Sequence, residues 1–174
     1  MYGRTFPEAR TWLAMPEKKT LEHARQAEKE GKAPSTQAGE FVREEIEHIR
    51  EGKHGARSTK QAIAIGLSKA RRAGVKLRPP KKGTVSEEAR HKAEREYEVA
   101  QSGEKRSAPS RKRGRATTKA LRRESRKTAS KMSLSRQAQS AARGRTHEDR
   151  SSAARKAART RAKGLAAKPR PMIA

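Results

Sequence analysis

The fold is decided by residues 58–74, which read STKQAIAIGLSKARRAG. Ser58 and Gln61 have the spacing of a capping box, in which two side chains three residues apart satisfy the first backbone N–H groups of a helix. Gly74 stands where a helix that ends at Ala73 favours a residue in the left-handed conformation. The spacing therefore predicts a helix over residues 59–73.

One side of this predicted helix is made of small and apolar residues. They recur three and four positions apart, as residues on one helical face do: Ala62, Ile63, Gly66, Leu67, Ala70 and Ala73. Because Gly66 has no side chain, we expect it to let another helix approach closely. The cations of the helix are expected on its other sides: Lys60, Lys69, Arg71 and Arg72. Ile65 projects among them, where it would cover a neighbouring segment or a second protomer.

A second helix is predicted over residues 36–51, capped by Ser35 or Thr36 and ended by Gly52. Its apolar face is expected to consist of Ala38, Val42, Ile46 and Ile49, with Phe41 at the edge. An acidic stripe is expected on the opposite face: Glu40, Glu44, Glu47 and Glu51. A connector of five residues, 53–57, makes the two helices an αα-hairpin. We favour a packing hairpin over a DNA-reading helix-turn-helix, because no set of side chains is placed to read base edges.

The flanking sequence extends this hairpin into a helical module over residues 15–82. A further helix is predicted over 17–30 and ends at Gly31 and Pro34. Basic residues and prolines follow Gly74 as an extended linker, and residues 83–100 predict an additional helix that begins with the capping-box spacing of Thr84 and Glu87. Residues 1–14 are interpreted as an N-terminal extension, since Met15 is a second plausible start.

The remainder, residues 101–174, is rich in Arg, Lys, Ala and Ser. It contains 23 of the 45 Lys and Arg residues but only four of the 19 acidic ones, within a chain of formal net charge +26. Leu, Ile, Val and Phe make up 18 of 174 residues, about half of the roughly 20% below which highly charged chains stay disordered. The predicted fold is therefore all-α: a small helical hairpin module followed by a long, largely disordered basic tail with transient helices.

Such charge predicts a polyanionic partner, and nucleic acid is the most abundant one. Phosphate binding by spaced cations does not require a base sequence. Scarce aromatics disfavour stacking on single strands, which favours duplex DNA or structured RNA. Of these two partners, we expect DNA rather than RNA. The candidate contacts are Lys53, Arg57, Lys60, Lys69, Arg71, Arg72, Lys76, Arg78, Lys81, Lys82, Arg111, Lys112, Arg113, Arg115, Arg122, Arg123, Arg126, Lys127, Arg155, Lys156, Arg159, Arg161 and Lys163.

Residues 35–74 resemble a family of small, basic bacterial proteins of unknown function, whose distinctive core is KQAIAIGLSKAR, residues 60–71 here. The resemblance covers about residues 15–82 and implies a module without an established activity. The tail resembles the Ala-, Lys- and Arg-rich tails of linker histones. Together these features predict a non-enzymatic, nucleoid-associated or histone-like protein of the cytoplasm.

Enzyme chemistry finds little support in the sequence. The chain has no Cys, and no phosphate loop, nucleophile elbow or carboxylate pair is evident. Glu45 and His48 have the spacing of di-iron bundles, but the further carboxylates that such sites need are missing. We therefore expect a solvated pair, and an exposed His54. No metal site, cofactor or membrane-spanning segment is predicted.

Two alternatives remain open. The chain could be an interaction module that self-associates through the hairpin, with the acidic stripe and Ile65 as contacts and the tail only as a solubilising segment. It could also bind RNA or the ribosome, because counterion release does not distinguish DNA from RNA.

Overall fold

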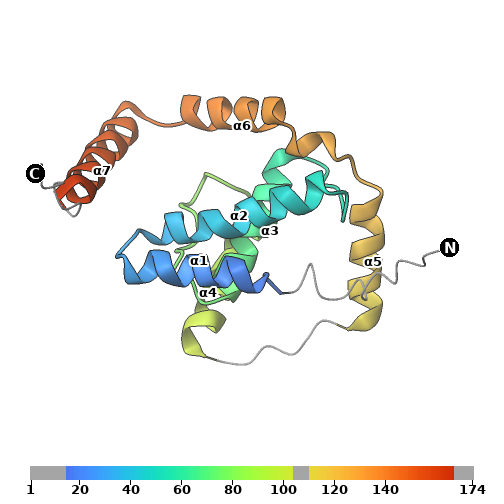
Figure 1. Cartoon of the computed structure of the whole chain (residues 1–174). Coiled ribbons are helices and arrows are strands. Elements are labelled where there is room, and N and C mark those ends of the chain that lie inside the picture. Colours follow the sequence, from blue (N-terminus) through green and yellow to red (C-terminus); the bar gives the residue numbers. More distant parts are fainter. Residues whose placement is uncertain (1–14, 104–109, 167–174) are drawn as a thin grey trace, which may run out of the picture. The chain divides into compact units, whose positions relative to one another are not determined.

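The computed structural model describes residues 15–103 and 110–166, without the side chains of Arg111 and of residues 163–166. The predicted N-terminal extension, residues 1–14, lies outside the described residues. Within them the regular structure is entirely helical, as predicted (Figure 1). The chain forms two units whose boundary falls between Leu134 and Ser135.

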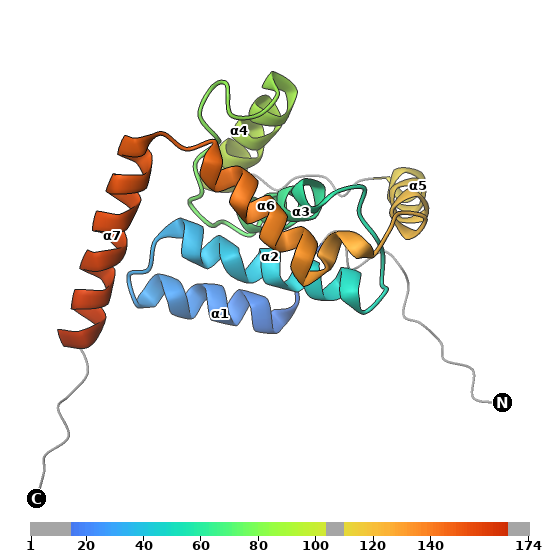
Figure 2. The same ribbon diagram turned by 90° about the horizontal axis from the view of Figure 1, so that it is seen from above.

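Four helices form the first part of the chain: α1 (Lys18–Lys29), α2 (Pro34–Arg50), α3 (Thr59–Arg72) and α4 (Glu87–Ser102). The first three lie within two residues of the ranges 17–30, 36–51 and 59–73 expected from the sequence. α1 and α2 lie side by side as a hairpin in both views (Figures 1 and 2). α3 packs against α2, and α4 packs against α3.

The α2–α3 hairpin packs through Gly66, as its sequence predicts. A Cβ atom at Gly66 would lie 2.7 Å from Cα of Val42 and 3.0 Å from the carbonyl oxygen of Phe41, closer than unstrained contacts allow. The hydroxyl of Ser58 accepts a hydrogen bond from the N–H of Gln61 at 3.2 Å, so the expected cap is present. Gly74 has a φ angle of +93°, the left-handed conformation that ends the helix.

Two helices begin at other residues than expected. α2 starts at Pro34 rather than after a Ser35 or Thr36 cap, because proline has no N–H to satisfy and its fixed φ suits the first helical position. α4 is capped by Ser86, whose hydroxyl accepts from the N–H of Ala89 at 3.3 Å. The hydroxyl of Thr84, the predicted cap, instead donates to the carbonyl of Lys81 within the preceding turn.

The core consists of two apolar clusters along α2. The first contains Ala24, Ala38, Phe41, Ala70 and Val75, with Leu21, Leu67 and Leu77 beside it. The second contains Ile46, Ile49, Ala56, Ala62 and Ala129, with Val42 and Leu134 beside it. The second cluster is thus completed by two residues from far along the chain. Because both clusters contain residues of α2, this helix lies at the centre of the core.

The segment after residue 110 differs from the largely disordered tail that the sequence predicts for residues 101–174. It contains α5 (Arg111–Arg122), the short 3-10 helix η1 (Lys127–Ala129), α6 (Lys131–Arg143) and α7 (His147–Ala166). Leu121 and Ala129 are buried, at 6% and 0% exposure. Residues 121–134, called the docked segment below, contribute the apolar contacts and backbone bonds that fasten this part of the chain to the α2–α3 hairpin.

The backbone of the docked segment follows the connector between α2 and α3. The N–H groups of Gly55 and Ala56 donate to the carbonyls of Leu121 and Ser125, at 2.8 and 3.2 Å. Two side chains of the hairpin add bonds to η1: Nε of Arg50 donates to Ala129, and the hydroxyl of Thr59 donates to Thr128. Because each bond uses a backbone carbonyl, composition alone does not reveal the docking.

The second unit, from Ser135 onward, has little apolar surface to bury. α7 begins with Glu148 and Asp149 in its first turn, and the hydroxyl of Thr146 accepts from the N–H of Asp149 at 3.1 Å. Both features stabilise a helix start. The cations of α7 whose side chains are described are all exposed: Arg150, Arg155, Lys156, Arg159 and Arg161.

Candidate functional site

Most of the predicted phosphate contacts are exposed to solvent. They are Arg57, Lys60, Arg72, Lys76, Arg78, Lys81, Lys82, Lys112, Arg113, Arg115, Arg122, Arg123, Arg126, Lys127, Arg155, Lys156, Arg159 and Arg161. The side chains of Arg111 and Lys163 lie outside the described set. Three predicted contacts are withdrawn from solvent: Lys53 is half-buried, and Lys69 and Arg71 are buried.

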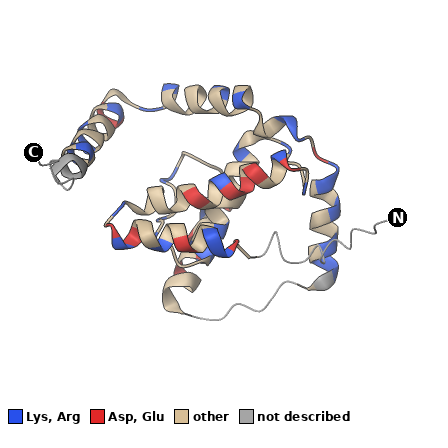
Figure 3. Cartoon of the chain, in the orientation of Figure 1, with Lys and Arg blue, Asp and Glu red and all other residues tan. Residues whose placement is uncertain are grey.

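α5 carries an ordered group of cations, here called the basic stripe: Lys112, Arg115, Lys119 and Arg122. Their spacing of three, four and three residues places them on one side of a helix. All four are exposed, and none forms an ion pair with another described residue. Figure 3 shows Lys and Arg along α5, whereas α1 and α2 carry many acidic residues as well. Lys119 was not among the predicted contacts.

A second face of α5 is partly withdrawn from solvent. Gly114, Thr118 and Leu121 follow one another at spacings of four and three residues, so they share a face roughly 110° around the helix from the basic stripe. Gly114 and Thr118 are half-buried and Leu121 is buried. The bond from Gly55 to the Leu121 carbonyl anchors the end of α5. The docked segment therefore orients the helix so that its cations face water.

Lys69, predicted as an exposed phosphate contact, is only 1% exposed. Its ammonium group lies 2.9 Å from Oε2 of Glu45 and 3.2 Å from Oε1 of Glu44. Lys69 lies seven residues after Ala62 and three after Gly66, which places it on their packed face. A buried ammonium must be paired to remain charged, and the two carboxylates of α2 supply that pairing.

Arg71 and Lys53 also have protein partners. Nε of Arg71 donates to the carbonyl of Leu77 at 3.2 Å, and burial lowers the pKa of Arg71 against the attraction of Glu96. Lys53 lies 2.9 Å from Glu51. Partial burial opposes the charge of Lys53, but hydrogen bonds to Glu51 and to Glu17 raise its pKa. Both cations thus have partners within the module.

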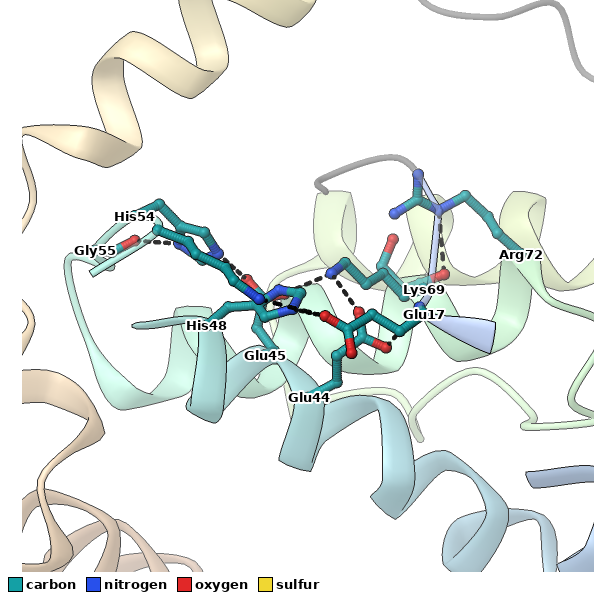
Figure 4. A network of polar contacts seen from close by, with 10 residues as sticks. Glu17, Glu44, Glu45, His48, His54, Gly55, Lys69 and Arg72 are labelled. Carbon is teal, nitrogen blue, oxygen red and sulfur yellow. Dashed lines mark hydrogen bonds and ion pairs between the residues drawn. The ribbon is translucent and has the colours of Figure 1, made fainter. Parts of the chain in front are cut away.

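A group of ionisable side chains, here called the buried polar cluster, lies between α2, α3 and the connector (Figure 4). Its members are Glu44, Glu45, His48, His54 and Lys69. Glu17, which directly precedes α1 and is exposed, contacts the cluster through His48. Glu45 is fully buried and His48 and His54 are 3% and 4% exposed. The solvated Glu45/His48 pair and the exposed His54 expected from the sequence are therefore wrong.

The hydrogen bonds of the cluster fix the orientation of both imidazole rings. Nε2 of His48 lies 2.8 Å from Oε1 of Glu17, and a carboxylate only accepts, so His48 donates. This bond lowers the pKa of the Glu17 carboxyl against its partial desolvation. Nδ1 of His54 lies 3.0 Å from the carbonyl of Gly55, and Nε2 lies 3.2 Å from Oε1 of Glu45.

One ligand atom each from Glu45, His48 and His54 lies within 4.8 Å of the others, a spacing that could hold a metal ion.

The predicted acidic stripe of the second helix is interrupted, because Glu44 is buried against Lys69. Ile65 is half-buried. It lies one turn before Ser68, whose hydroxyl donates to Glu96 of α4 at 2.6 Å. Glu47 and Glu51 of the stripe remain exposed.

No helix among the described residues is both long and apolar enough to span a membrane.

No curated protein and no solved structure gives a significant match to the chain. Residues 17–82, which run from the start of α1 to the linker before α4, match the model of a family described as "Family of unknown function (DUF6496)".

Proposed function

We propose that the protein binds nucleic acid, with duplex DNA as the preferred partner, through phosphate contacts that are largely independent of base sequence. The observation that carries the proposal is the basic stripe on α5. Its four cations lie on one exposed face, without an ion-pair partner among the described residues. Acidic residues elsewhere in the structure neutralise neighbouring cations, as Glu87 and Glu94 do for Arg90.

Counterion release supplies the driving force. Each phosphate neutralised by Lys or Arg frees condensed cations, so affinity should fall with salt by a log–log slope of about −0.9 per contact. A stripe of four cations spaced at helical intervals over residues 112–122 can contact several phosphates at once. Because the stripe lies on a helix that is already formed, little conformational entropy of the backbone remains to be lost on binding.

The chain beyond Leu134 carries further exposed cations. Its helices expose many cations and bury almost nothing, so we propose that this unit is disordered in the free protein and becomes helical as phosphates screen its like charges. A histone-like role in the nucleoid follows from this mode of binding. Structured RNA offers the same phosphate charge, and a direct comparison of the two polymers decides between them.

The test compares two variants that lose the same formal charge. The stripe variant is K112Q/R115Q/K119Q/R122Q, and the control is K18Q/K19Q/R25Q/K29Q on α1, whose four cations are exposed. Binding to a random-sequence DNA duplex and to a structured RNA is measured across a range of salt concentrations. The stripe variant should bind more weakly and lose about 3 to 4 from its salt slope, if every cation contacts a phosphate. Equal losses in both variants would show that only net charge matters and would overturn the assignment to α5.

A deletion that tests this proposal must leave the docked segment in place. Removing residues 101–174 takes away the cover of the second apolar cluster together with the cations. A chain that ends at Arg143 keeps the docked segment and α6 but lacks α7. We expect this chain to retain sequence-independent binding with a shallower salt slope. Complete loss of binding would place the interaction in the second unit and not in the basic stripe.

A further inference from the structure

Glu45, His48 and His54 meet at the end of α2. Glu45 and His48 lie one helical turn apart, and His54 enters from the connector before α3. All three are at most 4% exposed, and one ligand atom from each can lie within 4.8 Å of the other two. Two imidazoles and a carboxylate therefore converge in a space that the surrounding helices shield from water.

The contact between His54 and Glu45 requires a proton or a cation between the two groups. The carbonyl of Gly55 only accepts hydrogen bonds, so Nδ1 of His54 carries a hydrogen. In a neutral ring the second nitrogen, Nε2, then has a lone pair. This nitrogen lies 3.2 Å from Oε1 of Glu45, and two lone pairs at that distance repel. A proton, on the ring or on the carboxyl, or a bound cation relieves this repulsion.

The contacts around these three residues are those that orient metal ligands. Metal-binding histidines almost always donate their other N–H to a carboxylate or a carbonyl. His48 donates to Glu17, and His54 donates to Gly55. Lys69 holds Oε2 of Glu45 at 2.9 Å, which leaves Oε1 as the oxygen toward His54. Each of the three side chains is thus held by a second residue.

We propose that Glu45, His48 and His54 bind a divalent transition-metal ion, for which zinc has the matching chemistry. Two histidines and one glutamate form a known zinc ligand set, with a fourth position left for water. Bonds of about 2.0 to 2.2 Å in a tetrahedral arrangement separate ligand atoms by about 3.3 to 3.5 Å, close to the 3.2 Å between His54 and Glu45. Magnesium and calcium prefer oxygen ligands and do not fit this set.

Such a metal would act on the connector. His54 directly precedes Gly55 and Ala56, whose N–H groups bond to Leu121 and Ser125 of the docked segment. A bond from His54 to the metal would fix the connector and so favour docking. The metal site does not depend on the proposed nucleic-acid binding, because its ligands lie inside the hairpin.

The test uses the full-length, untagged protein after treatment with a chelator. Zinc is titrated by calorimetry, and cobalt(II) is titrated as a probe whose visible absorption reports tetrahedral coordination. We expect one equivalent of metal. H48Q and H54Q should bind at least about 100-fold more weakly, and E17A, which removes a supporting contact, about 10- to 100-fold more weakly. The matched control is H91Q, because His91 is exposed on α4.

A measurement on the wild-type chain covers the case in which a variant fails to fold. The side-chain nitrogen resonances of the five histidines are recorded by NMR with and without zinc. Zinc should shift His48 and His54 and leave His23, His91 and His147 unchanged. Binding well below one equivalent, a loss equal in H91Q, or shifts confined to the other histidines would overturn the proposal.

Discussion

The N–H of Gly55 donates a hydrogen bond to the carbonyl of Leu121 at 2.8 Å. The two residues lie on opposite sides of the boundary of the family match, which ends at residue 82. Gly55 and Leu121 are both buried, and the second apolar cluster includes Ala129 of the docked segment. In this chain the folded module therefore extends beyond the matched residues and includes part of the basic region.

We predict that Gly55→Ala detaches the docked segment. A Cβ atom at this position would overlap the carbonyl oxygen of Glu124 and lie 2.5 Å from its carbonyl carbon. Since backbone atoms cannot rotate away, the bonds from the connector to Leu121 and Ser125 must break or lengthen. We expect a loss of about 1 to 3 kcal/mol in the free energy of unfolding, measured by urea denaturation.

Gly114→Ala is the control for this substitution. A Cβ atom at Gly114 would meet nothing within 4 Å, and alanine stabilises a helix interior by about 0.5 to 1 kcal/mol relative to glycine. The control should therefore be neutral or more stable. Hydrogen exchange locates the effect: faster exchange at Gly55 and Ala56 is expected in Gly55→Ala only, and unchanged exchange there would contradict the predicted detachment.

We also predict that the docked segment stabilises the hairpin. A chain that ends at Ser102 leaves Ile46 and Ile49 without the cover of Ala129 and Leu134. A chain that ends at Arg143 keeps that cover. Burial of one large apolar side chain contributes about 1.5 to 3 kcal/mol, so the shorter chain should unfold at a lower urea concentration. Equal unfolding midpoints would mean that the docking adds no stability.

The sequence predicts the hairpin because local signals determine it. Ser58, Gly66 and Gly74 each have one role that a short stretch of sequence reveals: a cap, a close approach and a stop. Hydrophobic spacing then identifies which sides of the two helices meet. None of these inferences requires knowledge of residues far away in the chain.

The buried polar cluster cannot be predicted from local sequence signals in the same way. Glu45 lies four residues after Phe41 and four before Ile49, so it occupies the middle of a buried face, although a hydrophobic pattern treats it as exposed. Its partners come from another helix and a connector, and only the fold brings them together. Lys69 offered a signal, since its spacing from Ala62 and Gly66 places a cation on a packed face. The docking of residues 121–134 offered almost none, because backbone carbonyls make most of its polar contacts.

A third prediction concerns Gly66→Ala. The added Cβ atom would lie 2.7 Å from Cα of Val42 and 2.9 Å from its nitrogen, so α2 and α3 must move apart. We expect the free energy of unfolding to fall by about 1 to 3 kcal/mol. Gly39→Ala on α2 is the control, because a Cβ atom there meets nothing within 4 Å. If both alanines stabilise the protein equally, the helices do not approach as closely as the structure shows.

The fourth prediction is that Lys69→Met is strongly destabilising although it replaces a charge by an apolar side chain of similar length. Removing the ammonium group leaves Glu44 and Glu45 buried without their shared cation, at 4% and 0% exposure. Breaking a buried ion pair by removing one partner costs about 3 to 5 kcal/mol. Urea denaturation at neutral pH should show a loss of this size.

Lys60→Met separates the loss of that pairing from the loss of a positive charge in general. Lys60 lies on the same helix and is exposed, so its replacement should change the free energy of unfolding by at most about 0.5 kcal/mol. Adding Glu44→Gln to Lys69→Met removes one of the two unpaired carboxylates and should restore part of the stability. If Lys69→Met is as harmless as Lys60→Met, the ammonium group does not hold α2 and α3 together, and the packing of Gly66 against Val42 must suffice.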